Sequence, residues 1–226
     1  MKKIVLSIIV ALIAITANAQ VYVGGTFGVG SDKVETEGTE VKNTTFKILP
    51  EVGYELNEDW SKQMMTIAQI MEKMIAFSEG NIHDITHLSC VWTYAKTIGE
   101  LEGLDADTQF ILEVAAITHD IACPLCRKKY GNTNGKYQEQ EGAPLVREFL
   151  ADTGMTAEQI DRVAYLVGHH HSPAQIDGID YQILIESDYI VNASENGYDQ
   201  QAIRTFMEHT MKTAAGIRLT KTVFGV

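Results

Sequence analysis

Residues 110–126, FILEVAAITHDIACPLC, decide the fold that we predict for this chain. Residues 110–118 carry one charge, Glu113, and are otherwise uncharged and mostly apolar on every side of a helix. A helix with this pattern is buried all round rather than amphipathic. His119 and Asp120 follow at its C-terminal end, and Pro124 is expected to end the helix soon after. A buried imidazole beside a carboxylate is costly without a partner, so the pair is either a satisfied core pair or a pair of metal ligands.

Length and composition describe an ordinary soluble protein. The chain has 226 residues, 45% hydrophobic and 21% charged, which is enough for one good-sized domain with an appendage or for two small domains. The net charge of -12 argues against binding to a nucleic-acid polymer or an anionic membrane. Three cysteines are too few for a disulfide framework, so the body of the protein is expected to be intracellular and reduced.

The N-terminus points to a different compartment. Residues 1–19 have a basic start, an apolar stretch and a small-residue end, Ala17-Asn18-Ala19, which is the pattern of a secretory signal peptide. Such a signal would export the chain to the periplasm or the outer membrane. The helical part, in contrast, has the composition of a cytoplasmic domain.

Residues 20–60 have β-type composition. Val21–Gly25 and Thr44–Tyr54 are rich in β-branched and aromatic residues, and Gly30–Asn43 between them is polar and is expected to form a loop. With the signal, this segment resembles the first two strands of a porin-like outer-membrane β-barrel. We therefore divide the chain into a signal peptide (1–19), a β-like segment (20–60) and a helical domain (61–226), with the boundary at Trp60/Ser61.

The composition changes to helical after residue 60, and the fold class that we predict is an all-α bundle preceded by the short β-like segment. Thr156 to Gln159 has the pattern of a capping box that opens a helix. The predicted helices are 64–77, 82–98, 110–122, 156 to about 169, 181–193 and 200–217.

Four polar residues lie on helices that are otherwise apolar. They are His87, His119, Asp120 and Asp188, and each would be expensive to bury alone. One divalent metal ion could satisfy all four together. Mixed imidazole and carboxylate ligands suit Mn, Fe, Co, Ni or Zn better than Mg.

The order of these residues resembles the HD-domain superfamily of metal-dependent phosphohydrolases, over about residues 61–216. His87 is preferred to His83 as the first ligand because the family's first ligand is followed four residues later by an apolar residue, here Val91. His83 is then a residue that supports the ligands or contacts substrate, or a plain surface histidine.

The resemblance implies hydrolysis of a small phosphorylated molecule or a nucleotide by a metal-activated water. A non-catalytic metal- or nucleotide-binding sensor module is the alternative. A third reading is an exported barrel-type protein that carries the helical part as cargo.

Further candidates surround this set. In branches of the superfamily with two metals, extra histidines lie between the His-Asp pair and the last Asp, where His169, His170 and His171 stand in this chain. These histidines, with His170 and His171 as the candidates, could hold a second metal or contact phosphate. Several branches have Lys or Glu three residues after the Asp of the pair, but this chain has Cys123.

The segment after Cys123 allows several interpretations. Cys123 and Cys126 could be structural, part of a zinc site with Cys90, or a redox pair. Arg127 and Lys128 belong to a basic cluster that either binds the phosphate of a substrate or is a solvated loop.

Overall fold

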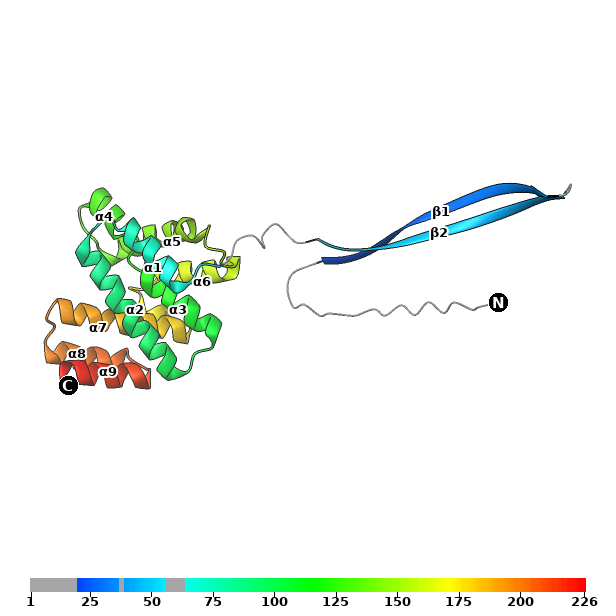
Figure 1. The fold of residues 1–226 in the computed structure, drawn as a ribbon. Helices are drawn as coiled ribbons and strands as arrows, with labels where there is room; N and C mark the ends of the chain where they lie inside the picture. Colours follow the sequence, from blue (N-terminus) through cyan, green and yellow to red (C-terminus); the bar gives the residue numbers. More distant parts are fainter. Residues whose placement is uncertain (1–19, 37–38, 56–63) are drawn as a thin grey trace. The chain divides into compact units, whose positions relative to one another are not determined.

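The computed structural model describes residues 20–36, 39–55 and 64–226 (Figure 1). The chain separates into two units, residues 1–61 and 62–226. The predicted signal peptide and the predicted boundary at Trp60/Ser61 lie outside the described residues.

The N-terminal unit contains one antiparallel hairpin. Strand β1 (Gln20–Thr36) pairs with β2 (Thr39–Glu55), in a register from Gln20 opposite Glu55 to Thr36 opposite Thr39. The expected loop over residues 30–43 was therefore wrong, because pairing continues to the tip and β-favouring Val and Thr residues recur there. Residues 64–226 contain no strand, so the resemblance to a porin-like barrel gains no support.

Residues 64–226 form an all-α unit, as predicted. The order is α1 (Ile67–Phe77), α2 (Ile82–Glu102), α3 (Ala106–Thr118), α4 (Cys123–Tyr130), α5 (Gly135–Leu150), α6 (Ala157–Val167), the short 3-10 helix η2 (Pro173–Gln175), α7 (Ile179–Glu195), α8 (Gln200–His209) and α9 (Ala214–Phe224).

Local sequence signals place several helix starts. Thr156 caps α6, and its side chain and that of Gln159 form the predicted capping box. Thr66 and Gln69 do the same at α1. Asn81 and Asp105 cap α2 and α3 with their side chains, so these N-terminal backbone amides are satisfied locally.

Helix α3 is the centre of the core. Residues 111–118 are all buried, as the uniform apolar pattern predicts. The helix packs against α1, α2, α6 and α7. Among the described residues, 106–130 form the one stretch long and apolar enough to cross a membrane, but 67% of that window is buried inside this unit. This stretch is therefore a core segment of the helical unit.

The structure corrects several helix boundaries. Helix α3 ends at Thr118 and not after Asp120, and Pro124 lies in the first turn of α4 instead of ending α3. Helices α4 and α5 were not predicted.

The predicted helix 200–217 is two helices. The break is held by Glu186 of α7, which accepts hydrogen bonds from the backbone N–H groups of Lys212 (2.7 Å) and Thr213 (3.1 Å). This contact comes from another element and is invisible in the local pattern.

Candidate metal centre

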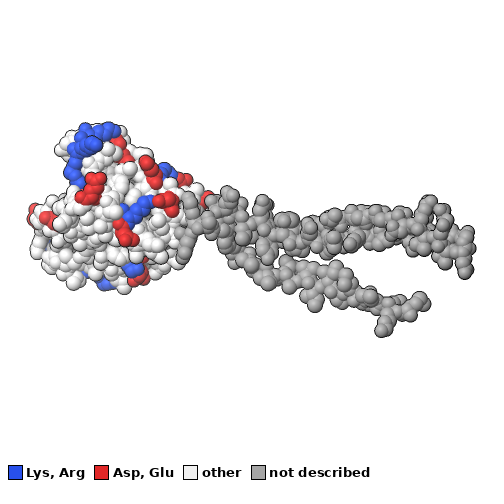
Figure 2. Space-filling model, turned by 45° about the horizontal axis from the view of Figure 1, so that its top comes forward, with Lys and Arg blue, Asp and Glu red and all other residues white. Residues whose placement is uncertain are grey.

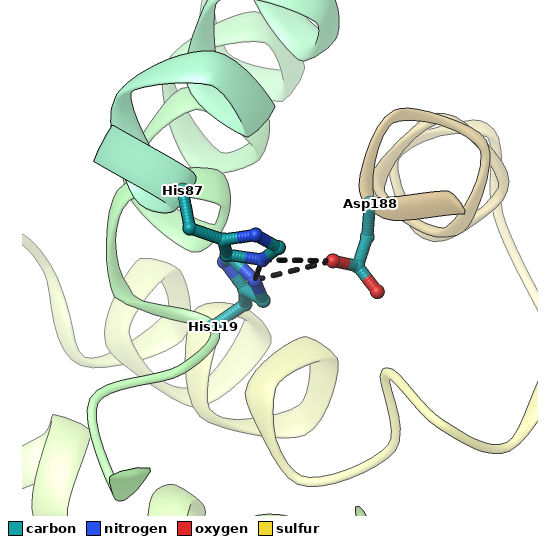
Figure 3. Close-up of side chains that lie close together, drawn as sticks. All are labelled: His87, His119 and Asp188. Atoms are coloured by element: carbon teal, nitrogen blue, oxygen red, sulfur yellow. Dashed lines mark hydrogen bonds and ion pairs between the residues drawn. The ribbon is translucent and has the colours of Figure 1, made fainter. Parts of the chain in front are cut away.

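Three buried side chains from three elements meet in the helical unit: His87, His119 and Asp188 (Figure 3). Nε2 of His87 lies 3.2 Å from Nε2 of His119 and 3.2 Å from Oδ1 of Asp188. Nε2 of His119 lies 3.4 Å from the same carboxylate oxygen. The structure thus brings together three of the four residues that the sequence proposed as ligands.

Each of these three side chains is held at a buried position on a helix or at its end. His87 is on the buried face of α2, His119 is the residue that caps the C-terminus of α3, and Asp188 is inside the almost wholly buried helix α7. Their exposed fractions are 5%, 0% and 8%. Water therefore supplies little of the solvation that these polar groups need.

Hydrogen bonds at the far side of each ring fix the imidazole tautomers. Nδ1–H of His119 donates to the carbonyl of Ala116 at 2.9 Å. Nδ1–H of His87 donates to Oε2 of Glu195 at 3.0 Å. In the neutral rings, both Nε2 atoms therefore present a lone pair toward Asp188.

This convergence needs a positive charge to be stable. Two nitrogen lone pairs and a carboxylate oxygen repel one another when nothing cationic lies between them. Burial alone would lower the pKa of His87, but Asp188 and Asp120 outweigh it and raise that pKa to about 9. Burial alone would raise the pKa of Asp188, but His119 and His87 hold it well below its usual range. The donor set therefore fits a divalent cation.

Asp120 lies beside this cluster and faces a second one. Its Oδ2 is 3.8 Å from Nε2 of His87 and 3.9 Å from Nε2 of His119, while its Oδ1 is 3.4 Å from Nε2 of His170. Burial alone would raise its pKa, but His119 and His170 hold it well below its usual range. Asp120 is thus a carboxylate shared by two groups of imidazoles.

The second cluster contains Asp120, His170 and His171. His170 is buried, and its Nδ1–H donates to the carbonyl of Val167 at 2.8 Å. Burial and the neighbouring His170 lower the pKa of His171 to about 4. His169, in contrast, stacks on Tyr165 and is in neither cluster.

The basic candidates lie on α4, where Lys and Arg side chains gather (Figure 2). Arg127 is held by Asp84, to which both terminal nitrogens donate, and its side chain is 40% exposed. The hydrogen bond to Asp84 raises the pKa of Arg127, and the charge of Asp120 adds to the effect. Lys128 is exposed too, so both candidate side chains reach the solvent.

Two other groups of candidates are outside the clusters. Cys123 and Cys126 are buried free thiols, and neither belongs to the candidate metal clusters of the described residues. Burial and Asp120 raise the pKa of Cys123, so its thiol stays protonated. The side chain of His83 is 76% exposed, and its Nε2 lies 4.0 Å from Oε2 of Glu195. His83 therefore lies at the edge of the site.

Sequence reasoning missed three residues that touch the clusters. Asn192 donates to Oδ1 of Asp188 at 2.8 Å, and Glu195 accepts from His87. Both follow Asp188 on α7, at spacings of four and seven that put them on the same helix face, so periodicity could have found them. Gln138, which contacts His170 and His171, lies on the unpredicted helix α5 and had no such signal.

One comparison with solved structures agrees with this architecture. Among solved structures, a predicted HD superfamily hydrolase from an uncultured Thermotogales bacterium has a TM-score of 0.53 and 18% identity, and the match covers 74% of this chain and 90% of that one. This likeness is one of fold. The Lin1889 protein of Listeria innocua has a TM-score of 0.45 and 17% identity, with 70% of this chain and 88% of that one covered.

No curated protein sequence matches the chain. The model of the HD domain matches residues 84–205, which is more than half of the chain and contains every residue of both clusters. This chain therefore belongs to the HD domain family.

Proposed function

We propose that this protein is a metal-dependent phosphohydrolase that acts on a small phosphorylated molecule or a nucleotide. The observation that carries the proposal is the convergence of His87, His119 and Asp188, buried and with both imidazole lone pairs aimed at one carboxylate oxygen. A site built only for packing would not bring three acceptors together.

The roles of the residues follow from their positions. His87, His119 and Asp188 would hold the cation, with Asp120 as a further ligand beside them. A divalent cation bound there would activate water and neutralise phosphoryl oxygens. Arg127, kept near the site by Asp84, and the exposed Lys128 would bind the phosphate of the substrate.

The donor set narrows the choice of metal and partner. Imidazole nitrogens with carboxylate oxygens favour Mn, Fe, Co, Ni or Zn. The net charge of -12 supports a small substrate over a nucleic-acid polymer or a membrane as the partner. The composition of the helical unit supports a cytoplasmic location for it, against the export signal expected at residues 1–19.

The test is elemental analysis of the purified chain together with a panel of phosphomonoesters and nucleotides, assayed with each of the five metals. We expect bound metal and turnover in the wild type, and loss of both in Asp120→Ala. Glu208→Ala, at an exposed carboxylate on α8, is the matched control and should behave as the wild type. Full metal content and wild-type turnover in Asp120→Ala would contradict the proposal.

A second candidate is a sensor module that binds metal without turnover. It is favoured by Cys123, a buried and protonated thiol at the position where several branches of the superfamily carry Lys or Glu. Metal binding with no hydrolysis across the whole panel would support this second candidate over the first.

A further inference from the structure

The side chain of Gln138 points into the second cluster in one fixed orientation. It lies in the first turns of α5 and is 5% exposed. Its Nε2 donates to the carbonyl of Thr133 at 2.9 Å. The reversed amide would place two oxygen acceptors against each other, so the oxygen must face the histidines.

The amide oxygen joins a group of atoms that is short of hydrogen-bond donors, because Nε2 of His171 is the one ring nitrogen facing it that can carry a proton while both rings are neutral. Oε1 of Gln138 lies 2.7 Å from Nε2 of His171 and 3.2 Å from Nε2 of His170. The same His170 nitrogen is 3.4 Å from Oδ1 of Asp120, and the other nitrogen of the ring already donates to Val167. A neutral imidazole has one N–H, so Nε2 of His170 turns a lone pair toward two oxygens when the ring is neutral, and either a proton on this nitrogen or a bound cation stabilises the arrangement.

The start of α5 is shaped to hold this histidine pair. A Cβ at Gly135 would lie 2.7 Å from the ring of His171, so glycine allows the helix to approach the ring. Glu139 accepts hydrogen bonds from the backbone N–H of His171 at 3.0 Å and from Oγ of Ser172 at 2.9 Å. Gly135, Gln138 and Glu139 at the start of α5 thus contact both the rings and the backbone of the histidine pair.

We propose that Gln138 supplies its amide oxygen as the fourth protein ligand of a second cation position, with Asp120, His170 and His171. Two imidazole nitrogens and two oxygens form a donor set that suits a first-row transition metal. Asp120 links the two positions, because one of its oxygens faces His87 and His119 and the other faces His170. The first position is the one formed by His87, His119 and Asp188. The inference rests on the proposed function only in assuming that this first position binds metal.

The experiment is a titration of the metal-free full chain with Co²⁺, in which binding is measured by calorimetry and by the visible absorption of the bound ion. We expect two equivalents in the wild type. Gln138→Met, similar in length but without the oxygen, should keep the first equivalent and weaken the second by about 10- to 100-fold. Gln138→Glu should bind the second equivalent more tightly, because a carboxylate adds negative charge.

Gln140→Met is the matched control, since Gln140 is an exposed neighbour on the same helix. Unchanged affinity for the second equivalent in Gln138→Met would overturn the role of Gln138 and leave the proposed function intact. One equivalent in an active wild type would remove the second position alone, and no bound metal at all would remove both proposals. If Gln138→Met loses its cooperative melting transition, Gln138→Glu decides, and a second equivalent no tighter than in the wild type overturns the inference.

Discussion

Asp188→Asn is the sharpest test of the candidate metal centre. The substitution keeps the size of the side chain and an oxygen but removes the negative charge that both His87 and His119 face. The hydrogen bond from Asn192 to Oδ1 can persist, so the local packing of α7 should change little. The variant therefore reports on charge at the site rather than on the fold.

The structure sets the size of the effect. A unit positive charge held 3.2 Å from Oδ1 of Asp188, the separation of this oxygen from Nε2 of His87, is attracted by about 5 kcal/mol at an effective dielectric constant of about 20, and a cation held between the two atoms would be attracted at least as strongly. Part of this is offset, because a neutral amide avoids the desolvation of a buried carboxylate. We expect a net loss of about 3 kcal/mol, which corresponds to roughly 100-fold weaker binding of the first metal equivalent.

The assay is calorimetric titration of the metal-free protein with Mn²⁺ or Co²⁺, with Glu208→Gln as a control for removal of one exposed charge. Thermal unfolding in a chelator verifies that the variant is folded. Wild-type affinity in a folded Asp188→Asn protein would refute the reasoning, because the carboxylate would then contribute nothing to a cation.

Four further outcomes are expected. Glu195→Gln, which weakens the acceptor that orients His87, should lower metal affinity by about 10- to 100-fold in the same titration without unfolding the protein. In the metal-free protein the pKa of His87 is about 9, above its unfolded value of about 6.5, so its contribution to the free energy of unfolding should be complete below pH 6.5 and fall by up to about 3 kcal/mol toward pH 9. Urea unfolding measures this fall, and excess Mn²⁺ should abolish it. A flat pH profile in chelator would show that His87 is not protonated in the metal-free protein. Removing the metal from wild-type protein held at 100 times its dissociation constant should cost about 2.7 kcal/mol and lower the melting temperature by roughly 5–10 °C, whereas Asp120→Ala should respond little to the chelator. A chain that starts at Lys62 should melt within a few degrees of one that starts at Gln20, because the helical unit contains its own core; loss of cooperative unfolding in the shorter chain would show that the hairpin belongs to the domain.

The fold of the helical unit was predictable where the pattern is local. The uniform apolar run before His119 predicts a buried helix, and the capping box at Thr156 predicts the start of α6. Pro124 was misjudged, because proline is excluded from helix interiors yet favoured in a first turn, and only the position of α4 distinguishes the two. The break before α9 depends on Glu186, which is distant in sequence.

The candidate site, like the fold, was predictable from the sequence only in part. His87, His119, Asp120 and Asp188 are identifiable from the sequence because a polar residue on an apolar helix needs a partner, whatever the arrangement of the helices. The convergence of three of them on one point, and the place of Asp120 between two clusters, required the packing of α2, α3 and α7.

The sequence alone determined the helical class, the buried central helix and the residues rich in ligand chemistry, because these follow from local periodicity and from the cost of burying polar groups. Only the tertiary structure decided which of these residues lie close enough together to share a cation, since that depends on distances between atoms far apart in the chain. Gln138 shows the limit most clearly: an amide on an amphipathic helix is ordinary in sequence, and its meaning comes from the two imidazoles that α6 and the turn after it place against its oxygen.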